Sequence, residues 1–69
     1  MELANRIRRI RLLKGLSQEY VADKMNISQP AYSRIENKAG SCSFNTLQKL
    51  ANVLNVKLTY LVDIETPIE

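Results

Sequence analysis

The sequence contains no histidine and only one cysteine, Cys42. A single cysteine cannot form an intramolecular disulfide, and a metal site is not expected without histidine. The usual catalytic patterns are missing too, because there is no glycine-rich phosphate loop, no Gly-x-Ser-x-Gly sequence and no pairing of cysteine with histidine. We therefore expect no metal, no cofactor and no enzymatic activity.

Glycine, proline and phenylalanine are scarce, with two, two and one residues among 69. A strand-rich sandwich needs frequent turns, whereas this chain is rich in leucine, isoleucine, valine and alanine and favours short helices. At this length the chain can build one domain around one modest core. The composition predicts a single all-α domain.

Long apolar runs are absent as well. No stretch approaches the roughly 18 apolar residues that a membrane span needs. The N-terminus is charged at Glu2 and Arg6 and lacks the apolar region of a signal peptide. We therefore expect no membrane association and a cytoplasmic location.

Acidic residues are few before the last seven positions. Residues 1–62 hold ten basic and four acidic residues, a formal net charge of +6, whereas residues 63–69 hold three acids and no base. Half of the bases gather in one N-terminal segment, namely Arg6, Arg8, Arg9, Arg11 and Lys14. This asymmetry predicts a domain over 1–62 followed by a short acidic tail over 63–69. A basic segment of this kind suits an anionic partner, although it can equally form a solvated helix face.

Apolar residues recur at helical spacing in five segments, which predicts helices near residues 2–14, 18–25, 29–36, 44–54 and 58–63. The apolar face of the first is Leu3, Ile7, Ile10 and Leu13. That of the fourth is Phe44, Leu47, Leu50, Ala51 and Leu54. Residues 37–43 have Asn, Gly and Ser without an apolar period, and are expected to form a loop.

Serine stands just before three of these helices, at Ser17, Ser28 and Ser43. Serine is a favoured N-cap because its hydroxyl accepts a hydrogen bond from an unpaired first-turn amide. Pro30 then falls in a first turn, where the missing N–H has no intrahelical acceptor to lose. Asn26 stands where the chain turns sharply, and asparagine tolerates the left-handed conformation. These signals place two short helices, 18–25 and 29–36, on either side of a tight turn.

Two short helices joined in this way match a helix-turn-helix, whose second helix enters the major groove of DNA. An ordinary corner between two helices of a bundle is the alternative. The outward face of the second helix favours DNA, because it carries polar and long side chains rather than interchangeable charges: Gln29, Pro30, Ser33, Arg34 and Asn37.

The segment LSQEYVADKMNISQPAYSRIEN closely resembles the helix-turn-helix of the Cro and phage-repressor (cI-type) family, also called the XRE family, and LQKLANVLNVKLTYLV is similar to that family's next two helices. The resemblance runs from Arg6 to Val62. It implies a compact five-helix, lambda-repressor-like domain that binds double-stranded DNA and is encoded by a prokaryote or a phage.

Three positions depart from the family pattern. Asn26 replaces the usual turn glycine, and Tyr32 replaces a buried aliphatic residue of the recognition helix. The Tyr32 ring fits the core only if its hydroxyl reaches the surface or a partner. Asn37-Lys38 stands where the family often has Asn-Gly, so loop contacts to DNA are the least transferable part of the resemblance.

The outward face of the second helix supplies the residues expected to read bases, namely Gln29, Pro30, Ser33 and Arg34. Glutamine can pair bidentately with adenine and arginine with guanine, whereas Pro30 offers only apolar contact, for example to a thymine methyl group. Phosphate contacts are expected from residues near the helix starts and the loop: Gln18, Ser28, Asn37, Lys38, Ser41 and Ser43. For Arg34 the alternative is a solvated charge or a salt bridge, and for the loop residues it is solvation and capping.

Arg11 and Glu36 correspond to another feature of the family, a partly buried ion pair that ties the first helix to the end of the recognition helix. The alternative is that Arg11 joins the basic N-terminal face. We expect the structural role for both residues and leave them out of the DNA contacts.

One recognition helix reads few base pairs, so we expect a homodimer on a two-fold operator, acting as a transcriptional repressor. Its dimer surface is expected at Tyr60, Val62 and Ile64, which can equally complete the core. The alternative function is an antitoxin or adaptor whose main partner is another protein. No small-molecule ligand is evident from the sequence.

Overall fold

Five α-helices follow one another in the computed structural model, which describes residues 2–65 and 68. They are α1 (Glu2–Leu13), α2 (Gln18–Lys24), α3 (Gln29–Asn37), α4 (Phe44–Leu54) and α5 (Leu58–Val62), with a short 3-10 turn, η1 (Ala39–Ser41), between α3 and α4. No strand occurs in this part of the chain. The all-α prediction is confirmed, and each predicted helix begins at the observed residue and ends within one residue of the observed end.

The predicted serine caps all form. The hydroxyls of Ser17, Ser28 and Ser43 accept hydrogen bonds from the amides of Tyr20, Ala31 and Thr46, at 3.0, 3.2 and 3.2 Å. Pro30 lies in the first turn of α3, as predicted. The local signals in the sequence therefore set where α2, α3 and α4 begin.

Asn26, in the turn between α2 and α3, has a φ of +61°. Gly15 after α1 and Asn55 after α4 also have positive φ, at +73° and +58°. Glycine and asparagine tolerate this left-handed backbone better than other residues do. Asn26 thus makes the turn that the family usually makes with glycine.

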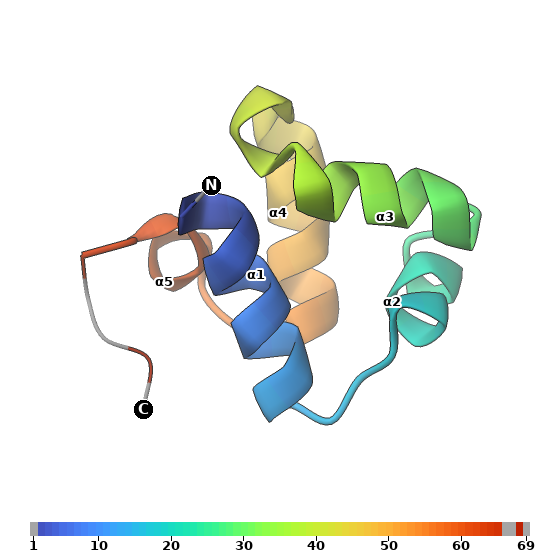
Figure 1. Ribbon diagram of the computed structural model, residues 1–69, viewed down its shortest axis with the longest axis horizontal. Coiled ribbons are helices and arrows are strands. Elements are labelled where there is room, and N and C mark those ends of the chain that lie inside the picture. Colours follow the sequence, from blue (N-terminus) through green and yellow to red (C-terminus); the bar gives the residue numbers. More distant parts are fainter. Residues whose placement is uncertain (1, 66–67, 69) are drawn as a thin grey trace.

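Each α-helix contributes to one core, which contains Ile7, Ile10, Val21, Ala22, Tyr32, Leu50, Ala51, Leu54 and Leu61 among its buried residues. α3 packs on both α2 and α1, while α5 packs on α1 and α4. In Figure 1, α2 and α3 lie at one end of the molecule and α5 lies at the other, beside α1. The α2–α3 unit therefore packs on α1 and α4, and one side of α3 stays open to solvent.

Two residues that were assigned to apolar helix faces are exposed instead. Leu13 is 60% exposed and Phe44 is 68% exposed. Leu13 is the last residue of α1 and Phe44 the first residue of α4, so each stands at a helix end, where the neighbouring helices no longer cover the side chain. Helical spacing alone does not reveal where such cover stops.

The predicted loop over residues 37–43 is partly helical. α3 continues through Asn37, and η1 follows, with Ala39 packed into the core at 1% exposure. Residues 66, 67 and 69 of the expected acidic tail lie outside the described residues, while Ile68 is half-buried against the core. The division into residues 1–62 and 63–69 stays a prediction.

Candidate nucleic-acid interface

α3 presents two opposite faces. Tyr32 and Glu36 have no exposed surface and point into the molecule. The other side reaches solvent and carries the four residues predicted to read bases, of which two are exposed and two half-buried: Pro30 and Arg34, then Gln29 and Ser33. Residues one helical turn apart share a face, so burial of Tyr32 and Glu36 turns the predicted reading side outward.

The residues predicted to bind phosphate lie around the ends of α2, α3 and α4. Gln18 begins α2 and Ser28 caps α3, while the other four follow the path from α3 to α4 and are all exposed: Asn37, Lys38, Ser41 and Ser43. The Ser28 and Ser43 hydroxyls already act as helix caps. What these two positions offer an anion is therefore the exposed start of a helix rather than an unoccupied hydroxyl.

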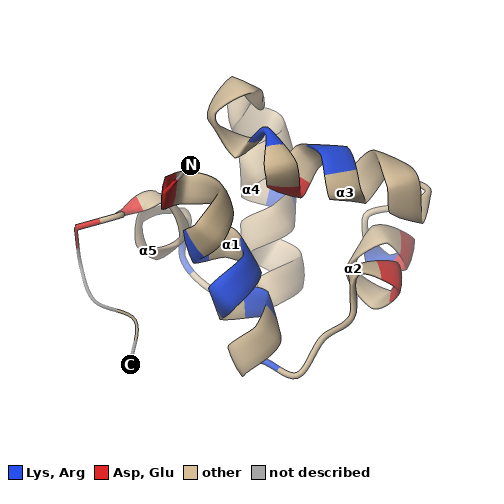
Figure 2. Ribbon diagram, viewed as in Figure 1, with Lys and Arg blue, Asp and Glu red and all other residues tan. Residues whose placement is uncertain are grey.

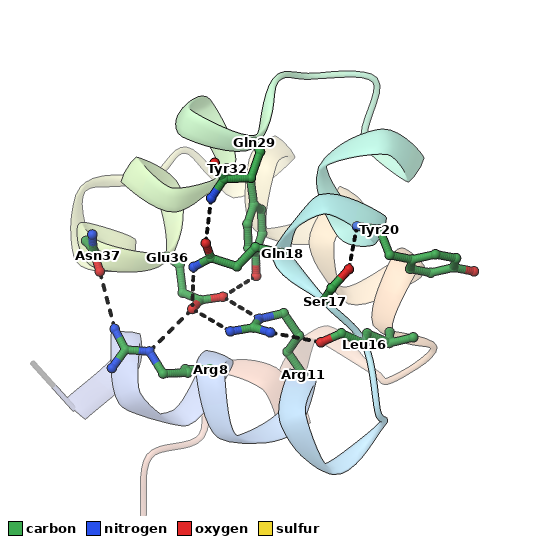
Figure 3. Close-up of polar contacts among 10 residues, drawn as sticks. All are labelled: Arg8, Arg11, Leu16, Ser17, Gln18, Tyr20, Gln29, Tyr32, Glu36 and Asn37. Atoms are coloured by element: carbon green, nitrogen blue, oxygen red, sulfur yellow. Dashed lines mark hydrogen bonds and ion pairs between the residues drawn. The ribbon is translucent and has the colours of Figure 1, made fainter.

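Glu36 is the centre of the polar network behind α3. Arg11 donates to it twice, with Nε to Oε2 at 2.9 Å and Nη2 to Oε1 at 3.2 Å. Arg8 also approaches Oε1, at 3.4 Å from its Nε. Arg11 in addition donates through Nη1 to the Leu16 carbonyl at 2.8 Å, which ties α1 to the start of α2 (Figure 3). The structure thus pairs Arg11 with Glu36, and Arg11 is buried rather than part of the basic face.

The Tyr32 hydroxyl donates to Oε2 of Glu36 at 2.5 Å. This contact explains how tyrosine fits where the family has an aliphatic residue, because the ring fills the core while its polar end reaches a buried acceptor. Among the described residues, no buried side-chain nitrogen or oxygen lacks a hydrogen-bond partner.

Electrostatics keep Glu36 ionised. Burial by itself raises the pKa of this carboxyl, but the hydrogen bonds from Arg11, Tyr32 and Gln18 outweigh burial, and the pKa falls below its ordinary value. The hydrogen bond to Glu36 raises the pKa of Arg11. Burial, followed by the bond to Glu36, raises the pKa of Tyr32, so its hydroxyl remains a donor at neutral pH.

Gln18 joins this network to the reading face. Its Nε2 donates to Oε1 of Glu36 at 3.2 Å, and its Oε1 accepts a hydrogen bond from Nε2 of Gln29 at 2.7 Å. Figure 3 shows the two glutamines in series between the carboxylate and the start of α3. A residue predicted to bind phosphate and a residue predicted to read bases are therefore in direct contact.

Arg8 was not singled out as a site residue. Its Nη2 donates to Oδ1 of Asn37 at 3.3 Å, and its side chain is 45% exposed. Arg8 precedes Arg11 by three residues and so lies on the same side of α1. That spacing was the available signal, but a run of arginines does not show which of them face α3.

The predicted dimer residues lie away from α3, at the end of the molecule where α5 packs on α1 (Figure 1). Val62 and Ile64 are 37% and 47% exposed, whereas Tyr60 is half-buried. Arg6, itself buried, donates to the Tyr60 carbonyl through Nε at 2.9 Å and Nη2 at 2.7 Å, and lies 4.8 Å from the centre of the Tyr60 ring. Arg6 thereby fixes α5 against α1.

Basic residues recur along α1, whereas α3 carries Arg34 and Glu36, with Lys38 just after its end, and α2 carries two acidic residues and Lys24 (Figure 2). The surface therefore carries both positive and negative charges. Only those basic residues that face phosphates would add to the affinity for DNA. Each helix in the described part of the chain falls short of the length and apolar character needed to cross a bilayer.

The free energy of unfolding is expected to fall when the pH drops below about 4.5, the ordinary pKa of a glutamate. Because the pKa of Glu36 is lower in the folded protein, the unfolded chain takes up this proton first, and the stabilisation is full above the ordinary value and lost below it. Urea unfolding between about pH 7 and about pH 3 would measure the loss.

Two variants isolate the contribution of Glu36 to this acid response. Glu36→Gln should flatten the response because no carboxylate then faces Arg11, Arg8 and Tyr32. Glu19→Gln, at an exposed position of α2, should leave it unchanged. An equally steep acid loss in Glu36→Gln would contradict the assignment.

A helix-turn-helix family model matches residues 7–61. The chain is 36% identical over 56 residues to the uncharacterized HTH-type transcriptional regulator YqaE of Bacillus subtilis, an alignment that covers 81% of this chain and 48% of that protein. It is 33% identical over 57 residues to the SPbeta prophage-derived uncharacterized HTH-type transcriptional regulator YonR of the same organism, covering 83% and 53%. The chain spans about half the length of these curated relatives. No solved structure matches it significantly.

The family match covers most of the chain and includes the whole α2–α3 unit with its tight turn. The five helices agree with that match. The resemblance inferred from the sequence is confirmed, and the chain belongs to the XRE family of helix-turn-helix proteins.

Proposed function

We propose that this protein binds double-stranded DNA sequence-specifically as a small transcriptional regulator, with α3 in the major groove. The observation that carries the proposal is the orientation of α3, which buries Tyr32 and Glu36 and leaves its opposite side open to solvent. At 9 residues, α3 is about 13 Å long and can present a few side chains to about four or five base pairs. The names of the curated relatives as transcriptional regulators support the same function.

Arg34 and Gln29 carry base recognition in this proposal. The exposed guanidinium of Arg34 can pair with guanine, and the Gln29 amide can pair with adenine. Ser33 adds a short hydrogen bond, and Pro30 an apolar contact. Phosphates are bound by residues on both flanks of α3, namely Gln18, Ser28, Asn37, Lys38, Ser41 and Ser43.

The proposed assembly is a homodimer that binds a two-fold operator, with half-sites roughly 34 Å apart, and represses transcription. The exposed side chains of Val62 and Ile64 support a dimer surface at α5, at the opposite end of the molecule from α2 and α3. The Bacillus subtilis relatives, one of them prophage-derived, support a bacterial or phage origin and hence action on DNA in the cytoplasm.

Selection of bound sites from random DNA tests the proposal. We expect a motif with two-fold symmetry, and we expect Arg34→Ala to lose about 1–3 kcal/mol of discrimination at one base pair of each half-site. Lys49→Ala removes the same charge from an exposed position of α4 and is the matched control, which should keep the motif.

Two results would contradict the proposal. One is a motif that is identical for the wild type and Arg34→Ala. The other is the absence of any motif together with a stoichiometric protein that copurifies from the native host, which would favour the antitoxin or adaptor function.

A further inference from the structure

An ionised carboxylate accepts hydrogen bonds and donates none. Glu36 has no exposed surface, and donors from Arg8, Arg11, Tyr32 and Gln18 surround it. The Gln18 amide can therefore meet Oε1 of Glu36 only through its NH2 group. Its oxygen must point the other way.

The direction of the first amide determines that of the second. Because Oε1 of Gln18 faces Gln29, the contact at 2.7 Å requires Gln29 to donate through its own Nε2. One N–H of Gln29 is then in use, while its second N–H and its Oε1 remain available. Adenine offers in the major groove the matching pair, an acceptor at N7 and a donor at N6.

We propose that Glu36 is a positioning residue for base recognition, which orients the Gln29 amide for adenine through Gln18. We call this series of two hydrogen bonds, from Glu36 through Gln18 to Gln29, the glutamine link. The inference rests on the proposed function, and it adds to the structural role of Glu36 a specificity role that acts across two helices.

A protein without the glutamine link lacks this directional constraint. If a neutral amide replaced the carboxylate, both orientations of Gln18 would find a partner, and in one of them Gln29 would accept from Gln18 through its oxygen. Gln29 would then offer its two N–H groups more readily than the pair that matches adenine. Loss of preference for adenine at one base pair, with the other positions kept, is the signature of the link.

The experiment measures dissociation constants for operators with each of the four bases at the position read by Gln29, which Gln29→Ala identifies as the position where preference is lost. The preference for adenine there is expected to be about tenfold in the wild type and to fall to about two- to threefold in Glu36→Gln and in Gln18→Met. Gln18→Met keeps the length of the side chain and leaves the ion pair of Glu36 in place. Gln18→Met shows whether the contact between Gln18 and Gln29 matters for the preference. If Glu36→Gln does not fold, Glu36→Asp, which keeps the charge but draws the carboxylate away from Gln18, tests Glu36 itself.

Tyr32→Phe is the matched control, because it removes a donor to Oε2 of Glu36 while Gln18 binds Oε1. It should lower the melting temperature and leave the preference for adenine unchanged. Because preference is a ratio between operators, a lost phosphate contact in Gln18→Met cancels from it. Unchanged preference in a folded Glu36 variant, whatever Gln18→Met does, or an equal loss in Tyr32→Phe, would overturn the inference.

NMR of the side-chain amides in the DNA-free protein separates this inference from the proposed function. Glu36→Gln should shift the amide signals of Gln18 and Gln29 together, whereas Tyr32→Phe should leave Gln29 in place. If those signals do not move, the glutamine link is wrong. If they move but the wild type selects no DNA motif, the proposed function fails, and the role of Glu36 in base recognition fails with it.

Discussion

Arg11→Ala is expected to lower the free energy of unfolding by about 3–5 kcal/mol, because it leaves Glu36 buried without its main partner. The side chains of Arg11 and Glu36 are 8% and 0% exposed, so water cannot replace the lost hydrogen bonds without entry into the core. The same substitution removes the donor to the Leu16 carbonyl between α1 and α2. The variant therefore loses the contacts of Arg11 both with α3 and with the segment before α2.

The size of this effect is large for so small a domain. A chain of 69 residues has a total unfolding free energy of roughly 3–10 kcal/mol. The variant should therefore be partly or largely unfolded near room temperature, which circular dichroism during urea titration can measure.

Arg9→Ala is the matched control, since Arg9 is an exposed arginine on the same helix. Its effect on the free energy of unfolding should stay within about 0.5 kcal/mol. Equal stability losses in Arg9→Ala and Arg11→Ala would contradict the buried role of Arg11.

The affinity for DNA is expected to fall steeply with salt. If six phosphates are neutralised per dimer, the logarithm of the association constant should fall against the logarithm of the salt concentration with a slope of about −5. Between about 50 mM and about 200 mM salt, this slope is a loss of about a thousandfold. Fluorescence anisotropy of a labelled operator measures it directly.

Two lysines of equal charge test where the phosphates lie. Lys38 is exposed at the end of α3, on the predicted phosphate-binding flank, and Lys38→Ala should reduce the slope by about 1 for each contact removed. Lys49→Ala, on α4, should leave the slope unchanged. A flat salt response of the wild type, or equal slopes in the two variants, would argue against a DNA interface along α3.

Among the predicted features, those that depend on residues close together in the sequence could be derived from the sequence. Ser17, Ser28 and Ser43 act within one turn of helix, so their hydroxyls mark helix starts whatever lies around them. Asn26 and Pro30 act through the backbone alone, and both take the conformations expected of them. The helical period then assigned the outward side of α3 without knowledge of its neighbours.

Features that depend on which helix covers which residue required the tertiary structure. The N-terminal arginines look alike in the sequence, yet Arg6 and Arg11 are buried and Arg8 and Arg9 are exposed. Helical spacing predicted that Leu13 lies in the core, yet its side chain is exposed. The spacing shows which side of the helix a residue is on, but not how far the neighbouring helix extends.

By itself, the sequence determined five helices, a tight turn and the polar side of α3, because each depends on interactions within a few residues. Only the tertiary structure decided what lies behind that side. The contacts of Glu36 with Arg11 and Gln18 join residues 25 and 18 positions apart, and they depend on how three helices cross. The sequence showed that Tyr32 departs from the family pattern. The acceptor of its hydroxyl could be identified only once the buried carboxylate of Glu36 was located in space.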